Sequence, residues 1–503
     1  MEKTPIIFTI SNSLSKQVEE VIPKEENTVK MYSCGPTVYD FPHIGNIRYF
    51  VFVDILRRTL ETLGYKVIQA VNLTDVEDKT IKGAQKEKVS LKKFTEKYTK
   101  CFFNDLKTLN IEEAEFYPKA TENIKEIIEF ITKLIEKGHA YEKDGNVYYK
   151  ISSFEDYGKL SGMDLSSLKQ NAQGRLEDEY EKDDPRDFAL WKAKVPEDGD
   201  IFWDSPWSKG RPGWHIECSV MSAKYLTNAY KSGKLNTDSF ETIDMHTGGV
   251  DLIFPHHTNE IAQSEGVFGK QFIKYWVHCE HLLVDGKKMS KSAGNYYTLK
   301  DLLEKGFSPR AIRYAFLSTH YKQQLNFTIK NLENAENVIT KLDNFVFFLN
   351  RIIKKAESTT TPVKQKKPKE EIIKIGEDAV TEFKNLLAED LNIPKALSAM
   401  FEFINTINKR AKEIEAEDTR RILDALQEMD KVLGLFDFEQ ETSDVDDKVF
   451  ELIEERNKAR QKEDWKKADK IRDELKEKGI ELIDTKEETY WKKAKIKVKE
   501  KKA

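Results

Sequence analysis

The first pattern along the chain is a buried strand, a polar loop and an amphipathic helix. Residues 29–33 predict a buried strand. In residues 47–63 apolar positions recur with a period close to 3.6, which predicts a helix that ends at Gly64. Residues 66–71 predict a second strand. A strand, loop, helix and strand in this order predict a right-handed βαβ unit with parallel strands.

A similar unit follows later in the chain. Residues 241–246 predict a strand, and Gly248 and Gly249 predict a turn in which the backbone can approach a ligand closely. A helix then begins near His256 and continues through Ala262. Two such halves are typical of a doubly wound parallel sheet, so we expect an α/β fold with a Rossmann-type catalytic sheet. Such sheets bind ligands at the carboxyl ends of their strands, where helix N–H groups favour phosphate.

The remaining segments predict an inserted α+β connective segment, a helical bundle and a small C-terminal domain. Residues 164–186 and 439–447 are polar and predict loops, and residues 359–369 predict a linker. We expect the first half of the catalytic sheet in 1–80, the connective insertion in 81–186, the second half in 187–285, a cationic loop and stalk in 286–330, the helical bundle in 331–438, and the small C-terminal domain with a basic tail in 448–503.

Composition narrows the class of protein. A chain of 503 residues is too long for one core and predicts several domains. With 82 basic and 87 acidic residues the net charge is −5, so no global basic field indicates a nucleic-acid partner, although a local basic face would be enough. Four widely spaced cysteines without a CxxC pair favour reduced thiols in a cytosol. The sequence contains no signal peptide and no apolar run that approaches roughly 20 residues, so we expect a cytoplasmic protein without a membrane span.

Residues that could bind one metal ion lie in three separate segments. His256 and Glu260 are four apart and therefore share a helix face. Together with the thiols of Cys34 and Cys218, an imidazole and a carboxylate make a set of ligands that suits zinc. Taken alone, the pattern also fits buried free cysteines and a surface His–Glu pair. Adjacent His256 and His257 are not expected to face Glu260 together, so the four-residue spacing selects His256.

Two further motifs suit a phosphate group. His43-Ile-Gly-Asn46 lies between the first strand and the first helix, although His43 could also be only a capping residue. Lys288 and Lys291 lie three apart among serines and a glycine, which predicts a flexible cationic loop. Such a loop could neutralise charge that develops on leaving pyrophosphate, but composition alone fits an ordinary exposed basic loop equally well.

The order of these motifs resembles that of class I aminoacyl-tRNA synthetases, and specifically the cysteinyl-tRNA synthetase family, over nearly the whole chain. The most telling segments are Phe254-Pro-His-His-Thr-Asn-Glu260 and Lys288-Met-Ser-Lys-Ser292, which we call the KMSKS loop. Gly213-Trp-His-Ile-Glu-Cys218 is similar to a zinc segment of that family, and Ala459–Asp484 to its anticodon-reading block. One position departs from the family signature, because Asn46 stands where a second His is usual and cannot act as a cation.

The resemblance implies ATP-dependent ligation of L-cysteine to its cognate tRNA through a cysteinyl-adenylate. One Zn²⁺ per chain would bind the substrate thiol, which separates cysteine from serine far better than shape alone and makes an editing domain unnecessary. Mg²⁺ would accompany ATP, and a monomer is expected. The resemblance implies these site residues: for catalysis Lys288, Lys291, His43 and Asn46, with Lys291 the preferred lysine; for ATP His43, Asn46, Gly249, Asp251 and Lys291; for the amino acid Cys34, Gly35, Thr74, Trp214 and His246; for zinc Cys34, Cys218, His256 and Glu260; and for the tRNA anticodon Arg460, Asp469 and Asp484.

Two other functions share part of this pattern. A ligase that adenylates cysteine and joins it to a small amine-bearing acceptor should lack the anticodon block, and residues 440–491 argue against it. A non-catalytic RNA-binding paralogue should have lost the KMSKS loop or a zinc ligand, and the sequence retains both.

Overall fold

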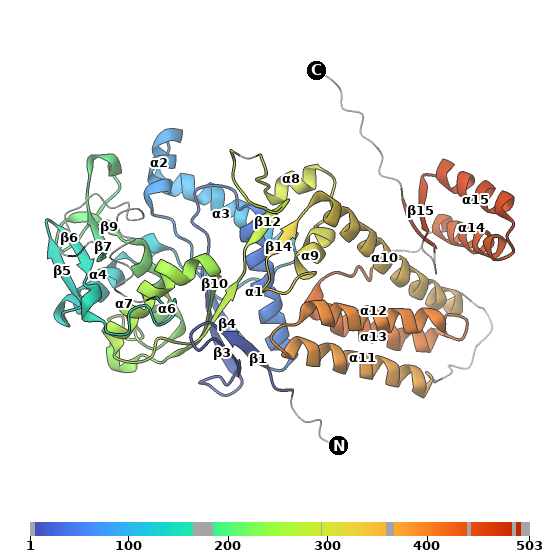
Figure 1. Ribbon diagram of the computed structural model, residues 1–503, viewed down its shortest axis with the longest axis horizontal. Helices are drawn as coiled ribbons and strands as arrows, with labels where there is room; N and C mark the ends of the chain where they lie inside the picture. Colours follow the sequence, from blue (N-terminus) through green and yellow to red (C-terminus); the bar gives the residue numbers. More distant parts are fainter. Residues whose placement is uncertain are drawn as a thin grey trace. The chain divides into compact units, whose positions relative to one another are not determined.

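The structure is a computed structural model that describes residues 6–163, 184, 186–292, 294–358, 367–439, 444–484 and 489–493 (Figure 1). Almost all of the loop expected at 164–186, and most of the linker expected at 359–369, lie outside these residues. The chain divides into two compact units. The first contains Met1–Gly306, Phe316–Phe327 and Lys384–Pro394, and the second contains Phe307–Ala315, Thr328–Phe383 and Lys395–Ala503.

A four-stranded parallel sheet forms the centre of the first unit. Its order is β11-β10-β3-β4, and every neighbouring pair is parallel. The strands are β3 (Thr28–Ser33), β4 (Lys66–Val71), β10 (Ile243–Gly249) and β11 (Ile273–Cys279). Helix α1 (Ile44–Thr62) links β3 to β4, and α7 (Thr258–Phe268) links β10 to β11. This topology confirms the predicted Rossmann-type α/β class, and its strand order reverses between β3 and β10, where such sheets bind ligands.

An antiparallel sheet forms a second layer of structure in the first unit. Its order is β5-β6-β7-β9-β8. The strands are β5 (Ala140–Lys143), β6 (Asn146–Tyr149), β7 (Phe188–Ala193), β8 (Trp203–Asp204) and β9 (Lys209–Pro212). The boundary expected between residues 186 and 187 falls inside this sheet, because β7 pairs with β6. A short buried apolar run looks the same in either sheet, so the sequence alone does not assign 188–212 to one of them.

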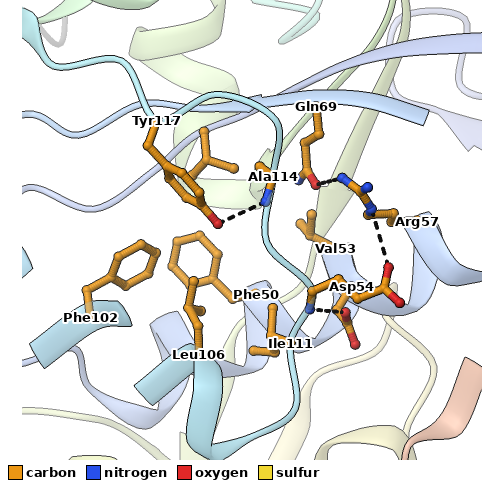
Figure 2. A pocket seen from close by; sticks show the side chains of 12 residues that line it. Phe50, Val53, Asp54, Arg57, Gln69, Phe102, Leu106, Ile111, Ala114 and Tyr117 are labelled. Carbon is orange, nitrogen blue, oxygen red and sulfur yellow. Dashed lines mark hydrogen bonds and ion pairs between the residues drawn. The ribbon is translucent and has the colours of Figure 1, made fainter. Parts of the chain in front are cut away.

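Helix α1 is fixed on both sides by buried arginines. Arg57 donates to the Glu115 carboxylate at 2.8 and 3.0 Å, and Figure 2 shows Arg57 beside Gln69 at a pocket lined by residues of α1, β4 and α3 (Leu91–Thr108). Arg48 donates at 2.7–3.3 Å to four backbone oxygens, those of Glu280, His281, His320 and Gln323. These carbonyls flank the strands β12 (Leu282–Val284) and β14 (Leu325–Phe327), which form a small sheet with β13 (Lys287–Lys288). Arg48 therefore connects α1 to the base of the KMSKS loop.

A segment from far along the sequence completes the first unit. Asp390 accepts hydrogen bonds from Ser11 N at 2.7 Å and Ser11 Oγ at 2.6 Å, beside the strand β1 (Thr9–Asn12) that pairs with β2 (Gln17–Glu20). The same carboxylate accepts from the Tyr321 hydroxyl at 2.5 Å, and its backbone oxygen lies 2.8 Å from Nε2 of His320. Asp390 thus joins Ser11, near the beginning of the first unit, to Tyr321, near its end.

The other elements of the first unit are mostly helical. They are α2 (Asp78–Glu87), α4 (Ile124–Glu136), α6 (Trp214–Leu226) and α8 (Leu299–Glu304).

Where the structure describes it, the second unit is helical apart from one hairpin. Its helices are α10 (Ile329–Glu357), α11 (Glu370–Ala388), α12 (Ile393–Lys409), α13 (Ala416–Leu433), α14 (Asp444–Gln461) and α15 (Trp465–Glu477), followed by β15 (Ile480–Asp484) and β16 (Thr489–Lys493). The division between the units falls inside three helices, α9 (Pro309–Leu317), α11 and α12. Residues 439–447 were expected to form a loop, but α14 already begins at Asp444. Acidic residues in the first turn of a helix are stabilised by the helix dipole. Among the described residues no helix is long and apolar enough to cross a membrane.

Candidate metal and nucleotide site

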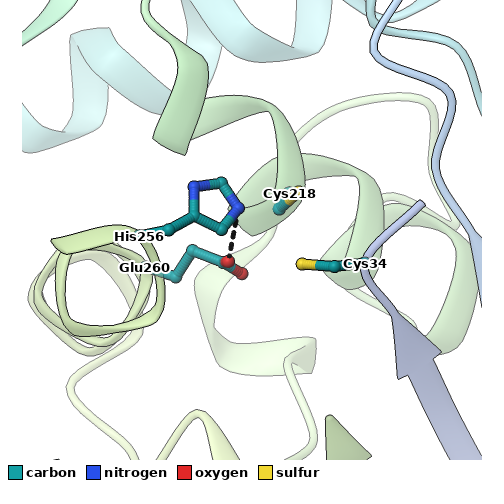
Figure 3. Close-up of side chains that lie close together, drawn as sticks. All are labelled: Cys34, Cys218, His256 and Glu260. Carbon is teal, nitrogen blue, oxygen red and sulfur yellow. Dashed lines mark ion pairs between the residues drawn. The ribbon is translucent and has the colours of Figure 1, made fainter. Parts of the chain in front are cut away.

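Four potential metal ligands meet at the ends of the parallel strands. Cys34 follows β3, Cys218 lies on α6, and His256 and Glu260 lie at and just inside the start of α7. One donor atom from each lies within 4.8 Å of the others, and all four residues are buried. Figure 3 shows their side chains converging from separate segments. The structure therefore brings together the whole set that the sequence analysis assigned to zinc.

The electrostatics of this cluster suit a bound cation. Burial raises the pKa values of the Cys34 thiol and the Glu260 carboxyl group and lowers the pKa of His256. Glu260 Oε1 lies 3.1 Å from His256 Nε2 but makes no hydrogen bond with the described residues. Buried polar atoms are seldom left without a partner, and a divalent cation would supply one while favouring the thiolate form. Two sulfurs, an imidazole and a carboxylate are ligands that zinc accepts.

Neighbouring side chains orient these ligands. His256 Nδ1 lies 2.8 Å from His215 Nδ1, which turns its Nε2 towards the cluster. Glu260 Oε2 lies 3.0 Å from His246 Nε2. The Trp214 ring stacks on His256 with a centroid distance of 4.3 Å. Such outer contacts fix the rotamers of metal ligands, so His215 and His246 support the site.

Both adjacent histidines face Glu260, which corrects one sequence-based expectation. His257 Nε2 lies 4.0 Å from Glu260 Oε1 and 3.3 Å from Cys34 Sγ. Residues three and four apart both lie on one helix face, so the expectation that the two histidines do not face Glu260 together was wrong. A second set, Cys34, His246, His257 and Glu260, also has donor atoms within 4.8 Å of one another. The set with Cys218 and His256 offers two thiols and the other set only one, and soft thiolate ligands suit zinc.

The amino-terminal end of α1 carries the expected phosphate motif. His43 Nδ1 accepts hydrogen bonds from Gly45 N at 3.1 Å and Asn46 N at 3.2 Å, and Asn46 Oδ1 accepts from His43 N at 3.3 Å. His43 is therefore a capping residue, as one interpretation of the sequence held, and it also lies at the position where phosphate is favoured. A Cβ atom at Gly45 would come 2.9 Å from Met289 Cε, so the KMSKS loop packs on this helix end.

The second lysine of the KMSKS loop contacts the loop before α1. Lys291 Nζ lies 2.5 Å from Asp40 Oδ2 and 5.1 Å from the centre of the Tyr296 ring. Its hydrogen bond to Asp40 raises the pKa of Lys291. Lys288 is exposed on β13. The structure thus places Lys291, rather than Lys288, against the segment that carries His43.

The residues expected to bind the amino acid and ATP lie around the same strand ends. Gly35 follows Cys34, and a Cβ atom there would come 1.6 Å from Asn72 O, so only glycine fits. Thr74 is buried after β4, and its N donates to Pro36 O at 3.1 Å. Gly249 ends β10, and a Cβ atom there would come 2.5 Å from Asp251 Oδ1.

Of the three C-terminal residues expected to bind the anticodon, Arg460 and Asp484 contact each other, whereas Asp469 pairs with a different residue. Arg460 Nη1 donates to Asp484 Oδ1 at 2.9 Å, and Arg456 donates to the same carboxylate at 2.7 and 2.8 Å. These bonds, that with Arg456 most of all, lower the pKa of Asp484 to about 2. Asp469 lies on α15, where its carboxylate lies 3.3 Å from Arg472. Trp465, which the sequence analysis did not consider, is 58% exposed at the start of α15.

Comparison with known proteins defines the class first. The catalytic domain model of class I (C) tRNA synthetases matches residues 20–337, a DALR domain matches 382–437, and the cysteinyl-tRNA ligase anticodon binding domain matches 442–491. The solved structure of Mycobacterium tuberculosis methionyl-tRNA synthetase bound by methionyl-adenylate shares the fold, with a TM-score of 0.59 and 13% identity over 81% of this chain and 92% of that chain. These matches define the catalytic unit of a class I aminoacyl-tRNA synthetase.

Full-length relatives narrow the class to one family. A cysteine–tRNA ligase of Brachyspira hyodysenteriae is 45% identical over 486 residues, which cover 96% of this chain and 98% of that protein. One of Leptospira interrogans is 45% identical over 493 residues, with the same coverage of each chain. The chain belongs to the cysteine–tRNA ligase family, which confirms the resemblance and the enzyme class expected from its motifs.

Proposed function

We propose that this enzyme joins L-cysteine to its cognate tRNA in two steps and that a zinc ion selects the cysteine thiol. The observation that carries the proposal is the buried group of Cys34, Cys218, His256 and Glu260 at the strand ends of a class I synthetase sheet. Zinc held there would bind a thiolate and discriminate against the hydroxyl of serine. A pocket that relied on shape alone would separate such near-isosteres by only about 1–3 kcal/mol.

The first step would form cysteinyl-adenylate from cysteine and ATP. In this scheme the substrate carboxylate attacks the α-phosphate of ATP and pyrophosphate leaves, so the protein aligns the reactants and stabilises charge. His43 and Asn46 would hold phosphate oxygens at the α1 N-terminus, and Lys291, assisted by Lys288, would neutralise the leaving pyrophosphate. Mg²⁺ would accompany ATP. Gly249 and Asp251 would contact the adenosine, the former because its lack of a side chain leaves room.

The same pocket would position the amino acid. Cys34, Gly35 and Thr74 follow two neighbouring strands, and Trp214 lies on α6 with Cys218. His246 orients Glu260 and would also face the substrate side of the cluster.

The second step would transfer the cysteinyl group to the terminal adenosine of the tRNA. In the C-terminal block, Arg460, Asp469 and Asp484 would contact anticodon bases, because arginine suits guanine edges and aspartate accepts from base amines. Exposed Trp465 offers a flat surface on which an unpaired base could stack. The expected monomer and cytoplasmic location stay predictions, as does the division of the chain into six functional parts.

Two assays together test this function. Cysteine-dependent exchange of pyrophosphate into ATP measures the first step, and charging of cysteine tRNA measures the second. We expect both activities from the zinc-loaded full chain and neither with serine. Exchange without charging would favour the ligase with a small acceptor, and the absence of any exchange would refute both ligase functions and leave the RNA-binding alternative.

A further inference from the structure

Glu217 is a buried carboxyl group that none of the roles above uses. It lies near the start of α6, on the face that also carries Trp214 three residues earlier, and next in sequence to Cys218, which points to a neighbouring face. Glu217 is 0% exposed, and neither of its carboxyl oxygens makes a hydrogen bond with the described residues. Burying such a group without a partner is costly, so the position favours a partner from outside the chain.

The surroundings of Glu217 indicate the charge of that partner. Burial raises its pKa most, and the thiol of Cys218 and the carboxylates of Asp75 and Glu77 raise it further, whereas the Thr74 hydroxyl lowers it. Asp75 already has partners, because its carboxylate accepts from Thr121 N at 2.9 Å and from Thr121 Oγ1 at 2.5 Å. The carboxyl group of Glu217 is therefore close to both Cys218 and Thr74, and the acidic groups around it favour a cation.

We infer that Glu217, together with the Thr74 hydroxyl, binds the α-ammonium group of the amino-acid substrate. This inference rests on the proposed function, in which the substrate thiol binds beside Cys218 and Thr74 lines the pocket. Only two carbon atoms separate the sulfur of cysteine from its nitrogen, so a ligand held at the cluster by its thiol carries its ammonium group close to the Glu217 side of α6. An ammonium group supplies hydrogen bonds that the carboxylate lacks and a charge that offsets its burial.

This role makes Glu217 a specificity residue for α-amino thiols. The metal site alone would accept any small thiol, including those without an amino group. A site built around an ammonium group rejects ligands that lack it, because the buried carboxylate is then left unpaired. A role as a further metal ligand is less consistent with the geometry, since neither of the two donor sets among the described residues includes Glu217.

The test compares two ligands that differ only in the amino group. The zinc-loaded full chain is titrated with L-cysteine and with 3-mercaptopropionate, and zinc content is measured in each sample. We expect wild type to bind cysteine at least about tenfold more tightly, the factor that one charge-assisted hydrogen bond supplies. Glu217→Gln should lose at least about tenfold in cysteine affinity, keep its affinity for 3-mercaptopropionate and retain its zinc.

Controls separate this role from simple packing. Glu265→Gln removes a carboxylate that is partly buried, pairs with Lys159 and accepts from Phe272 N at 3.2 Å, and it should leave the ratio of the two affinities unchanged. Glu217→Asp retains the charge with a shorter reach and should lose less cysteine affinity than Glu217→Gln does.

Three results would overturn the inference. They are an equal loss of both ligands in Glu217→Gln, a loss of zinc in that variant, and no preference of wild type for cysteine over 3-mercaptopropionate. The last result needs no variant, so it decides the matter even if Glu217→Gln does not fold. Failure of the proposed function has a different signature, namely the absence of cysteine-dependent pyrophosphate exchange by wild type.

Discussion

The contact between Lys291 and Asp40 allows a test of whether Asp40 only positions the KMSKS loop or takes part in catalysis. Asp40→Asn removes the negative charge that Lys291 contacts, yet the amide oxygen can still accept the bond that Asp40 Oδ1 now accepts from Phe41 N at 2.9 Å. The loop before α1 should therefore keep its shape, while the KMSKS loop loses one attachment to it.

The expected size of the effect follows from exposure. The Lys291 and Asp40 side chains are 66% and 30% exposed, and ion pairs of this kind contribute roughly 0–1 kcal/mol. A change of that size alters the fraction of docked loop by at most about fivefold. Removing a group that stabilises charge in the transition state costs about 10²–10³ in rate, which is the loss expected for Lys291→Ala.

Single-turnover formation of the adenylate measures both variants directly. We expect Asp40→Asn to slow this step by no more than about fivefold, to change the apparent KM for ATP and to leave the KM for cysteine unchanged. The effect should shrink as salt is added, because exposed charges are screened, and Asp40→Glu should recover most of the rate. A loss in Asp40→Asn as large as that in Lys291→Ala, or one insensitive to salt, would show that Asp40 itself contacts the reacting groups.

Three further predictions concern the metal site and the C-terminal domain. Cys218→Ser should abolish zinc binding and raise the KM for cysteine more than that for ATP; full zinc by metal analysis would contradict its assignment as a ligand. The pKa of Asp484 lies at about 2, below its usual value near 3.9, so its bonds to Arg456 should stabilise the domain above about pH 4 and be lost as the pH falls towards 2. Acid unfolding followed by circular dichroism should show that loss in wild type but not in Asp484→Asn. Trp465→Ala should weaken tRNA binding by about 1–3 kcal/mol without changing cysteine-dependent pyrophosphate exchange, and equal tRNA KM values would exclude base stacking there.

Hydrophobic periodicity predicts many of the helices and strands because it reflects interactions within a single element. The strand at 29–33 and the helix that follows it are confirmed within a few residues, since an apolar period of 3.6 and a closing glycine act within single elements. The meeting of Cys34 with Glu260 was predicted with the help of the family resemblance, because the residue pattern alone also fits buried free cysteines.

Contacts that depend on tertiary packing were beyond the sequence. Strand β7 is an apolar run with two possible sheets, and only its pairing with β6 decides between them. The spacing of three residues already allows His257 to face Glu260, but its approach to Cys34 depends on how β3 and α7 pack. The isolation of Glu217 is a property of its neighbours rather than of its own segment, so it becomes visible only once those neighbours are placed.

The contact of Asp390 with Ser11 has a consequence for how the chain is made. A ribosome releases β1 first, but the carboxylate that binds it follows only after more than three quarters of the chain has been synthesised. Until the Lys384–Pro394 segment emerges, Ser11 and Tyr321 therefore lack their bonds to Asp390 and are hydrated instead. A fragment cut after residue 337, where the catalytic family match ends, would keep the metal ligands yet never gain this closure.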